Sequence, residues 1–372
     1  MAAACGPSPT LRSVCRQLVP AWADLRDDEI DVDPLLGGLS NKLWHARLPA
    51  PGGRHPTEIV LRQFCTTSGL IDRPYEQRVF AFLAGTGFAP KLFGANGEFR
   101  AEQYIRGVSL TVEEFGRPAT LEVVGDLIGQ FHSLEPPPDV TRYSPGCERP
   151  ANVLEQCDQW VRTALDAAQH ASPELVDRLR RCKDEFDRIV RPLLLMAQSP
   201  VVFCHNDVQE GNVIRSDDNE YFLIDYEVSY AAWNFRAYDL ANSLCETVID
   251  NQADNEHGFA IRPDLAPSPD AIRGMAVSYL KRVQALTPRG RRRSITSSAV
   301  DALIEVCLLT GFYTHVHLIG TAAQEVKLFK PVSHLLWAAW AVAKVHGSAI
   351  EFGYAQYARA RLDLFDRELQ RD

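Results

Sequence analysis

Hydrophobic and polar positions divide the chain into a strand-rich first part and a helix-rich remainder. Before residue 106, short apolar runs alternate with glycine and proline turns, which is typical of hairpins and small antiparallel sheets. Two stretches instead repeat apolar residues at helical spacing. We expect a helical lead-in within residues 1–30, strands flanking the glycine turn of residues 35–44 and at residues 59–64, 91–94 and 99–105, and a helix at residues 75–84.

From Leu110 the apolar spacing becomes mainly helical. One compact β segment interrupts it, with strands expected at residues 201–204, 213–214 and 221–224, and a loop is expected at residues 250–269. Helices are expected at residues 121–134, 152–168 and 173–196, the last with a kink at Pro192, and again from the end of the β segment to the end of the chain, apart from that loop. The most apolar stretch, residues 300–323, carries acids and histidines, so it predicts a buried helix rather than a membrane span.

Composition and charge narrow the classes of function. The 372 residues include 39 basic and 48 acidic side chains, so the net charge of −9 disfavours a nucleic-acid binder or a protein of anionic membrane surfaces. Nine cysteines without a Cys-x-x-Cys pair argue against a zinc ribbon and a disulfide framework. The N-terminus lacks the basic start and apolar core of a signal peptide, so we expect a cytoplasmic protein without membrane insertion. The basic run at residues 289–293 is interpreted as a solvated loop.

One polar loop carries the strongest chemical pattern. His205, Asp207 and Asn212 fill the spacing H-x-D-x-x-x-x-N, and Asp225 closes the strand expected at residues 221–224. A carboxylate such as Asp207 can orient a hydroxyl nucleophile and take its proton. Asn212 and Asp225 offer oxygen atoms from two loops, and Mg²⁺ prefers oxygen ligands. Either residue alone could merely cap a turn, but the complete order is that of kinase-type phosphotransferases.

The glycine turn of the first part is a candidate phosphate-binding loop. Glycine allows a backbone to approach phosphate closely, and our candidates in this turn are Gly38, Ser40 and Asn41. Any hairpin can carry two glycines, so the turn alone is a weak indication. No Walker A sequence occurs, which disfavours a P-loop enzyme.

Further nucleotide-site candidates follow this turn. Arg62, on the third expected strand, lies where protein kinases place a lysine, and Glu76 on the following helix could pair with it. An unrelated surface pair is the alternative for these two residues. Gln103 and Tyr104 fall within residues 102–105, at the expected hinge, where backbone groups could meet the edge of an adenine.

These patterns together resemble the choline/ethanolamine kinase family, within the wider fold of protein kinases and aminoglycoside phosphotransferases. The matching segments are residues 37–44, 60–62, 89–94, 102–105, 203–212, 224–227, 234–239 and 350–354. By this resemblance, Asp207 is the general base. Asn212 and Asp225 bind Mg²⁺ with help from Glu227. Arg62 and Gln103 bind the phosphates and the adenine of ATP.

The C-terminal aromatic residues predict a site for an organic cation. A quaternary ammonium has no N–H to donate, so a protein holds it with aromatic faces and nearby acids. Trp337 and Trp340 are spaced i, i+3, on one helix face, although ordinary helix packing is the alternative. By resemblance, the residues lining an amino-alcohol pocket are Gln209, Glu246, Trp337, Trp340, Phe352 and Tyr357.

One segment departs from the family pattern. Choline kinases typically carry several aromatic residues after their Cys-Glu pair, whereas residues 247–251 after Cys245 and Glu246 are Thr-Val-Ile-Asp-Asn. Part of the aromatic lining of the amino-alcohol pocket is therefore expected to be missing or replaced. A primary ammonium such as that of ethanolamine needs fewer aromatic walls and gains from carboxylates.

We therefore expect an α+β, two-lobed protein-kinase-like fold. A small antiparallel-sheet lobe would span residues 1–105 and a large, mainly helical lobe residues 106–372. The expected reaction is phosphorylation of choline or ethanolamine by ATP with Mg²⁺, for phospholipid synthesis, and the resemblance implies a homodimer. The alternatives are another small-molecule kinase of this fold, such as an aminoglycoside phosphotransferase, and a non-catalytic pseudokinase.

Overall fold

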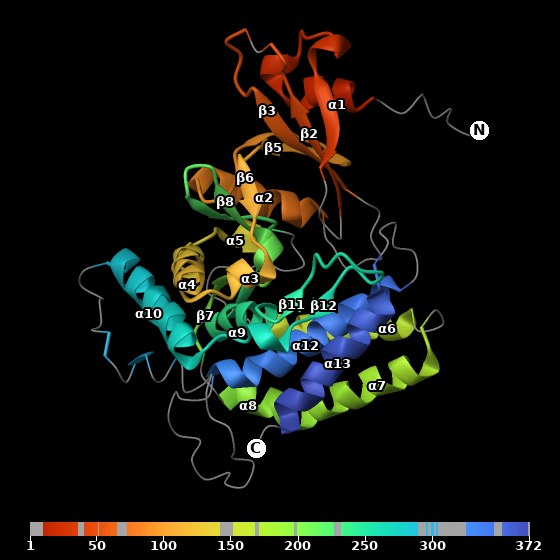
Figure 1. The fold of residues 1–372 in the computed structure, drawn as a ribbon, viewed down its shortest axis with the longest axis vertical. Coiled ribbons are helices and arrows are strands. Elements are labelled where there is room, and N and C mark those ends of the chain that lie inside the picture. The colour runs from red at the N-terminus through yellow and green to blue at the C-terminus, as the bar shows by residue number, and fades with distance from the viewer. Residues whose placement is uncertain are drawn as a thin grey trace. The chain divides into compact units, whose positions relative to one another are not determined.

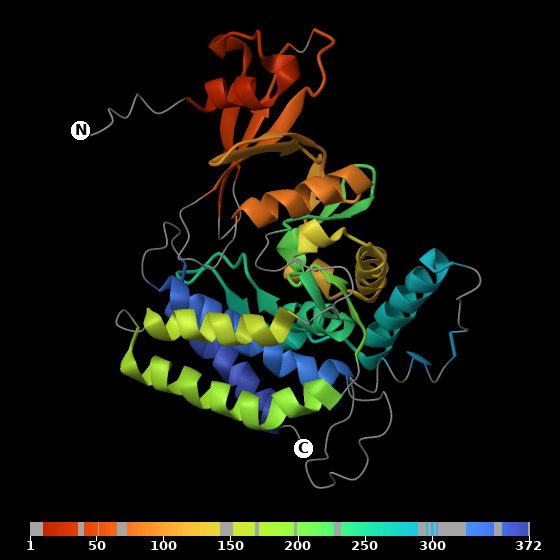
Figure 2. The same cartoon turned by 180° about the vertical axis from the view of Figure 1, so that it is seen from behind.

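The structure, a computed structural model, is shown as a ribbon in Figure 1 and from behind in Figure 2. It describes residues 10–35, 41–50, 52–64, 73–141, 152–167, 171–196, 199–226, 232–288, 295–296, 299–300, 303, 325–345 and 352–370. Within these residues the chain forms two compact units, the first ending at Gly107 and the second beginning at Val108. The first is built on a sheet and the second mainly on helices, so the predicted fold class is confirmed.

The first unit contains a five-stranded antiparallel sheet with the strand order β1-β2-β3-β5-β4. The strands are β1 (Asp31–Leu35), β2 (Asn41–Arg47), β3 (Glu58–Phe64), β4 (Leu92–Ala95) and β5 (Phe99–Gln103). In the central strand β3, Leu61 lies opposite Trp44 of β2 and Ala101 of β5. Ile59 and Leu61 are both fully buried, which is the period of two expected when one face of a strand lies on a core. The predicted hairpin and later strands are confirmed.

Two predicted helices accompany this sheet. In α1 (Leu11–Leu18), the side chain of Thr10 caps the N-terminus by accepting the N–H of Ser13. The apolar face of α1 joins the core of the sheet through Val14, Cys15 and Leu18. Between β3 and β4, α2 (Arg73–Thr86) buries Val79, Phe80 and Leu83. Helical spacing in the sequence thus located both helices correctly.

The second unit holds the longer helices. They are α4 (Pro118–His132), α6 (Asn152–Asp166), α7 (Pro173–Glu185), α9 (Arg236–Glu246), α10 (Pro269–Leu286), α12 (Glu325–Lys344) and α13 (Tyr354–Gln370), with the shorter α3 (Val112–Phe115), α5 (Pro138–Thr141) and α8 (Arg191–Met196). Figures 1 and 2 show α12 and α13 lying beside α6 and α7, and α12 also contacts α9. Residues 332–343 of α12 are all buried, because neighbouring helices cover it on several sides.

The helix predicted over residues 173–196 is interrupted. α7 ends at Glu185, a π-helical turn occupies Phe186–Val190, and α8 begins at Arg191. Pro192 explains the break, because proline has no N–H to donate and its ring would clash with the carbonyl of Arg188 in a regular helix. The kink predicted at Pro192 therefore takes the form of a wider turn directly before it.

Seven short strands complete the described part of this region. The predicted ones are β7 (Val201–Cys204), β8 (Val213–Ser216) and β9 (Tyr221–Leu223). Sequence analysis missed β6 (Gly107–Ser109), β10 (Ala232–Phe235), β11 (Ile249–Asp250) and β12 (Ala260–Ile261), the last two within or beside the predicted loop. β11 and β12 are only two residues long, too short to show an alternating pattern, so only their pairing with each other defines them.

The apolar stretch at residues 300–323 lies almost wholly outside the described residues. Among the helices that the structure does describe, none combines the length and the apolar character needed to cross a membrane.

Candidate active site

The candidate catalytic loop begins where β7 ends. β7 pairs antiparallel with β10, and the chain then runs from His205 to a 3-10 turn at Glu210–Asn212. Asn206, in this loop, has a left-handed backbone with φ of 69°. Asparagine adopts this conformation more readily than most residues, yet it remains uncommon outside glycine. Unusual backbone conformations of this kind cluster at functional sites.

Asp239, in the first turn of α9, fixes the start of this loop. Its carboxylate accepts the backbone N–H groups of His205 at 2.7 Å and Asn206 at 2.5 Å, and it lies 2.9 Å from Nε2 of His132. Asn234 adds a second anchor, because its Nδ2 donates to Oδ1 of Asn206 at 2.7 Å. Sequence analysis included Asp239 in a matching segment but missed this role, since the contacted loop lies more than 30 residues away.

Asp207 and Asn212 are joined within the loop. Nδ2 of Asn212 donates to the backbone carbonyl of Asp207 at 2.9 Å and to its carboxylate Oδ2 at 3.0 Å. Asp207 is half-buried and Asn212 is buried. The side-chain amide of Asn212 therefore holds the carboxylate of Asp207 in one orientation, and its own oxygen, Oδ1, points away from Asp207.

The next loop, which holds Asp225, is hydrogen-bonded to the candidate catalytic loop. Nε2 of His205 lies 3.0 Å from the carbonyl oxygen of Ile224, and the N–H of Ile224 donates to the carbonyl of Asn212 at 2.9 Å. Asp225 is itself left-handed, with φ of 65°. Asn212 and Asp225 thus bring an amide oxygen and a carboxylate from two connected loops, a donor set that fits Mg²⁺. Glu227, the predicted helper, lies outside the described residues.

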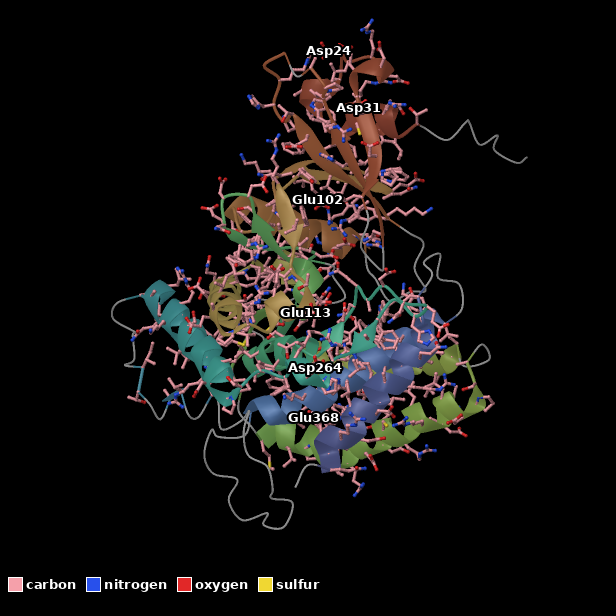
Figure 3. The ribbon with its side chains drawn as sticks, viewed as in Figure 1. Asp24, Asp31, Glu102, Glu113, Asp264 and Glu368 are labelled. Atoms are coloured by element: carbon pink, nitrogen blue, oxygen red, sulfur yellow. The ribbon has the colours of Figure 1, made fainter. Side chains whose placement is uncertain are left out.

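In the first unit, Arg62 belongs to a buried network of charges. Its Nε donates to Oε1 of Glu102 at 2.9 Å, and Nε of Arg100 donates to the same oxygen at 2.8 Å. Glu102, labelled in Figure 3, is almost fully buried. Burial alone would raise the pKa of Glu102, but Arg100 and Arg62 outweigh it and hold that pKa below its usual value.

The same network includes Glu76 and Asn41. Glu76 accepts from Arg100 at 3.2 Å and from Arg73 at 2.6 Å, and Arg73 also donates to Oδ1 of Asn41 at 2.9 Å. The structure therefore brings three of the predicted nucleotide-site residues into one network, while a direct Arg62–Glu76 pair stays a prediction. Gly38 and Ser40 lie outside the described residues.

Gln103 and Tyr104 lie at and just beyond the end of β5. The N–H of Gln103 donates to the carbonyl of Lys91 at 2.8 Å, and its Oε1 accepts the N–H of Lys91 at 3.3 Å. The ring of Tyr104 stacks on His45 with 4.0 Å between centroids. Because the N–H of Gln103 is used within the first unit, an adenine contact would need another group of this segment.

Aromatic side chains of α12, α13 and nearby loops form a cluster in the second unit. The ring of Trp340 lies 5.6 Å from Trp337 and 6.4 Å from Tyr357 between centroids, and Phe352 lies 5.4 Å from Tyr357. The four predicted pocket aromatics are therefore together. Phe259, which sequence analysis assigned to a loop without a role, joins them at 5.1 Å from Tyr357.

Trp337 also serves helix packing. Its Nε1 donates to Oδ1 of Asn242 on α9 at 3.0 Å, and Ser333 donates to the same oxygen at 2.8 Å. Its ring meets Trp160 of α6 edge to face at 6.0 Å. The packing alternative considered for the tryptophan pair therefore applies to Trp337 in addition to its place in the cluster.

Glu246, the predicted acid of the pocket, ends α9 and is fully paired. Its Oε1 accepts Nη2 of Arg361 at 2.5 Å, and its Oε2 accepts Nδ2 of Asn251 at 3.1 Å. Nε of Arg361 also donates to the hydroxyl of Tyr357 at 2.9 Å. Burial alone would lower the pKa of Arg361, but Glu246 and Tyr357 raise it above its usual range. Sequence analysis missed Arg361 and Asn251, although Arg361 lies one helical turn beyond Tyr357.

Gln209 and Glu210 shape the end of the candidate catalytic loop. Oε1 of Gln209 accepts the N–H of Gly211 at 2.8 Å, so this predicted substrate residue folds back on its own turn. Glu210 is completely buried and accepts the N–H of Asn251 at 2.9 Å. Burial, followed by the neighbouring Glu246, raises the pKa of Glu210 to about 8. Sequence analysis assigned no role to Glu210.

Comparison with known proteins identifies the family. Residues 32–366 match the family described as choline/ethanolamine kinase. A rat choline/ethanolamine kinase is 30% identical over 362 residues, covering 94% of this chain and 84% of that protein. Mouse choline kinase alpha is 28% identical over 386 residues, covering 94% of this chain and 78% of that protein.

Solved structures support the fold. A choline kinase from Cryptosporidium parvum superposes with a TM-score of 0.75 at 20% identity, covering 96% of this chain and 94% of its own. An ethanolamine kinase from Plasmodium vivax superposes with a TM-score of 0.72 at 18% identity, covering 98% and 91%. With a family match over residues 32–366, the chain belongs to the choline/ethanolamine kinase family.

Proposed function

We propose that this protein transfers the γ-phosphoryl group of ATP to the hydroxyl of choline or ethanolamine. The observation that carries the proposal is the arrangement of Asp207, Asn212 and Asp225 on two hydrogen-bonded loops. Family membership supports the reaction class and the two amino alcohols. The products would be ADP and phosphocholine or phosphoethanolamine, which are precursors for phospholipid synthesis.

Asp207 acts on the acceptor. Its carboxylate, oriented by Asn212, accepts the proton of the substrate hydroxyl as that oxygen forms a bond to the γ-phosphorus. The bond between the γ-phosphorus and the bridging oxygen breaks, and its electron pair leaves with ADP. The proton leaves Asp207 for solvent after the product departs.

Asn212 and Asp225 would hold Mg²⁺, with Glu227 as a third candidate. The bound ion would neutralise phosphate charge and align the γ-phosphoryl group. Arg62 would contact the phosphates, and the buried pairing with Glu102 supports this role because it fixes the guanidinium in one place. Gly38, Ser40 and Asn41 are proposed for the phosphates as well, and Gln103 and Tyr104 for the adenine. Glu76 would support this part of the site by holding the guanidinium of Arg100 in place through a hydrogen bond.

The amino alcohol is proposed to bind at the aromatic cluster. The rings of Trp340, Tyr357, Phe352 and Phe259 are of the kind that attracts a quaternary or primary ammonium, and Trp337 packs against Trp340. Gln209 and Glu246 would contribute polar contacts. Five buried free cysteines among the described residues agree with a reducing compartment and thus with the cytoplasm. The homodimer stays a prediction from resemblance.

One experiment separates this function from its alternatives. Purified protein is incubated with γ-labelled ATP, Mg²⁺ and a panel of choline, ethanolamine and aminoglycosides. We expect label on an amino alcohol. Label on an aminoglycoside alone would favour the other small-molecule kinases of this fold. Nucleotide binding without transfer to any acceptor would favour the pseudokinase.

A further inference from the structure

One side chain, Asn251, connects the catalytic loop to the acid beside the aromatic cluster. Its backbone N–H donates to Oε1 of Glu210 at 2.9 Å. Its Nδ2 lies 3.1 Å from Oε2 of Glu246 and 3.4 Å from Oε2 of Glu210. Glu210 belongs to the turn that ends at Asn212, and Glu246 ends α9, so Asn251 bridges two carboxyl groups from separate elements.

This bridge is part of a longer buried chain of contacts. Glu210 is 0% exposed and Glu246 is 2% exposed, so each needs internal donors to offset its lost hydration. Arg361 takes the remaining oxygen of Glu246 and continues to the hydroxyl of Tyr357 in the aromatic cluster. A continuous path of hydrogen bonds therefore runs from the catalytic turn through Asn251 to the aromatic cluster.

We propose that Glu210 and Asn251 are positioning residues that set the placement of the catalytic loop relative to the amino-alcohol pocket. The inference rests on the proposed function, because it takes the aromatic cluster to be the acceptor site. Glu210 follows Asp207 closely in the loop, so a movement of its turn changes the distance between the base and the acceptor hydroxyl. Such misplacement lowers the rate strongly even when the reacting groups are intact.

Two substitutions break the bridge differently. Asn251→Leu removes both side-chain donors while keeping the same branched arrangement of heavy atoms, and it leaves the backbone N–H that Glu210 accepts. Glu210→Gln keeps an oxygen for that N–H while placing an amide donor near the amide of Asn251. As a stability control, Val176→Ala removes buried methyl groups from α7, outside the bridge. The measurements are kcat and KM for choline, KM for ATP, and Tm.

We expect kcat/KM for choline to fall about 10- to 100-fold in each bridge variant, the range for a small misplacement of the reacting groups. KM for ATP should stay within about twofold of the wild type. The double variant, with both Glu210→Gln and Asn251→Leu, should have a kcat/KM for choline only slightly below that of either single variant. Each single change already breaks the side-chain contact between residues 210 and 251. Val176→Ala should lower Tm with kcat/KM for choline unchanged.

The outcomes separate the inference from the proposed function. Bridge variants that retain wild-type kcat/KM for choline overturn the inference alone. Equal losses for choline and ATP, or losses matched by Val176→Ala, also overturn it, because they indicate a structural role. If Asn251→Leu does not fold, Glu210→Gln decides by the same criteria. A wild-type protein that phosphorylates neither amino alcohol refutes the proposed function and the inference with it.

Discussion

Replacing Asp207 by asparagine tests the proposed chemistry most directly. The change removes one charge and one proton-accepting oxygen at nearly constant volume. Asn212 donates to Oδ2 of Asp207 and to its backbone carbonyl. An asparagine at this position can present its own side-chain carbonyl oxygen to Nδ2 of Asn212. The contact of Nδ2 with the backbone carbonyl does not depend on the side chain. The loop should therefore keep its conformation in the variant.

The expected effects on rate and stability differ in size. Loss of a general base costs about 10²–10⁴-fold in rate, or roughly 3–5 kcal/mol in the barrier. A hydrogen bond to a charged acceptor contributes about 1 kcal/mol more than one to a neutral acceptor, which corresponds to a shift of a few degrees in Tm. Asp207→Asn should therefore lose turnover while remaining folded.

The assay measures ADP release at saturating ATP and choline, together with ATP affinity and Tm. Asp217→Asn is the matched control, because Asp217 is an exposed acid of the same unit, and it should retain wild-type kcat. An Asp207→Asn protein with more than a third of the wild-type rate would exclude Asp207 as the base. A large fall in Tm would instead show that the carboxylate is needed for folding.

Further predictions concern the metal, the aromatic cluster and the buried ion pair. Asp225→Ala should lower kcat strongly with only partial rescue by excess Mg²⁺, and an unchanged Mg²⁺ titration would contradict the assignment. Trp340→Ala should reduce kcat/KM for choline about 2- to 30-fold more than for ethanolamine, whereas equal losses with a lower Tm would indicate core packing. Arg361→Met should lower the free energy of unfolding by about 3–5 kcal/mol in urea titrations, because Glu246 is left buried without its oppositely charged partner. Adding Glu246→Gln should recover part of this loss, and a double variant as unstable as the single one would contradict the pairing.

Sequence reasoning was most successful where the chemistry is local. The spacing of Asp207 and Asn212 lies within one loop, and the structure joins them directly by a hydrogen bond. The helix at residues 75–84 and the long strands repeat apolar residues often enough to show a period. In contrast, β11 contains two residues, so only its pairing with β12 reveals it.

The non-local contacts of the site were beyond the reach of the sequence. Asp239 reaches a loop that lies about 30 residues earlier, and Arg361 lies 115 residues from its partner Glu246. A buried charge pair requires a specific fold to bring its members together, and single-sequence periodicity holds no information about that pairing. Phe259 was missed for the same reason, since it reaches Tyr357 from a segment predicted as a loop.

The contacts of Glu246 and Phe259 change the substrate preference that we expect between choline and ethanolamine. The sequence suggested that missing aromatics after Glu246 loosen the aromatic lining of the pocket and that Glu246 favours a primary ammonium. In the structure, Phe259 contributes a ring to the cluster, and both oxygens of Glu246 already accept donors from Arg361 and Asn251. A primary ammonium would compete with those donors for the oxygens of Glu246, whereas a trimethylammonium has no N–H and does not compete for them. We therefore expect the wild-type protein to show a higher kcat/KM for choline than for ethanolamine. A clear preference for ethanolamine would mean that Glu246 exchanges one of its present partners for the substrate.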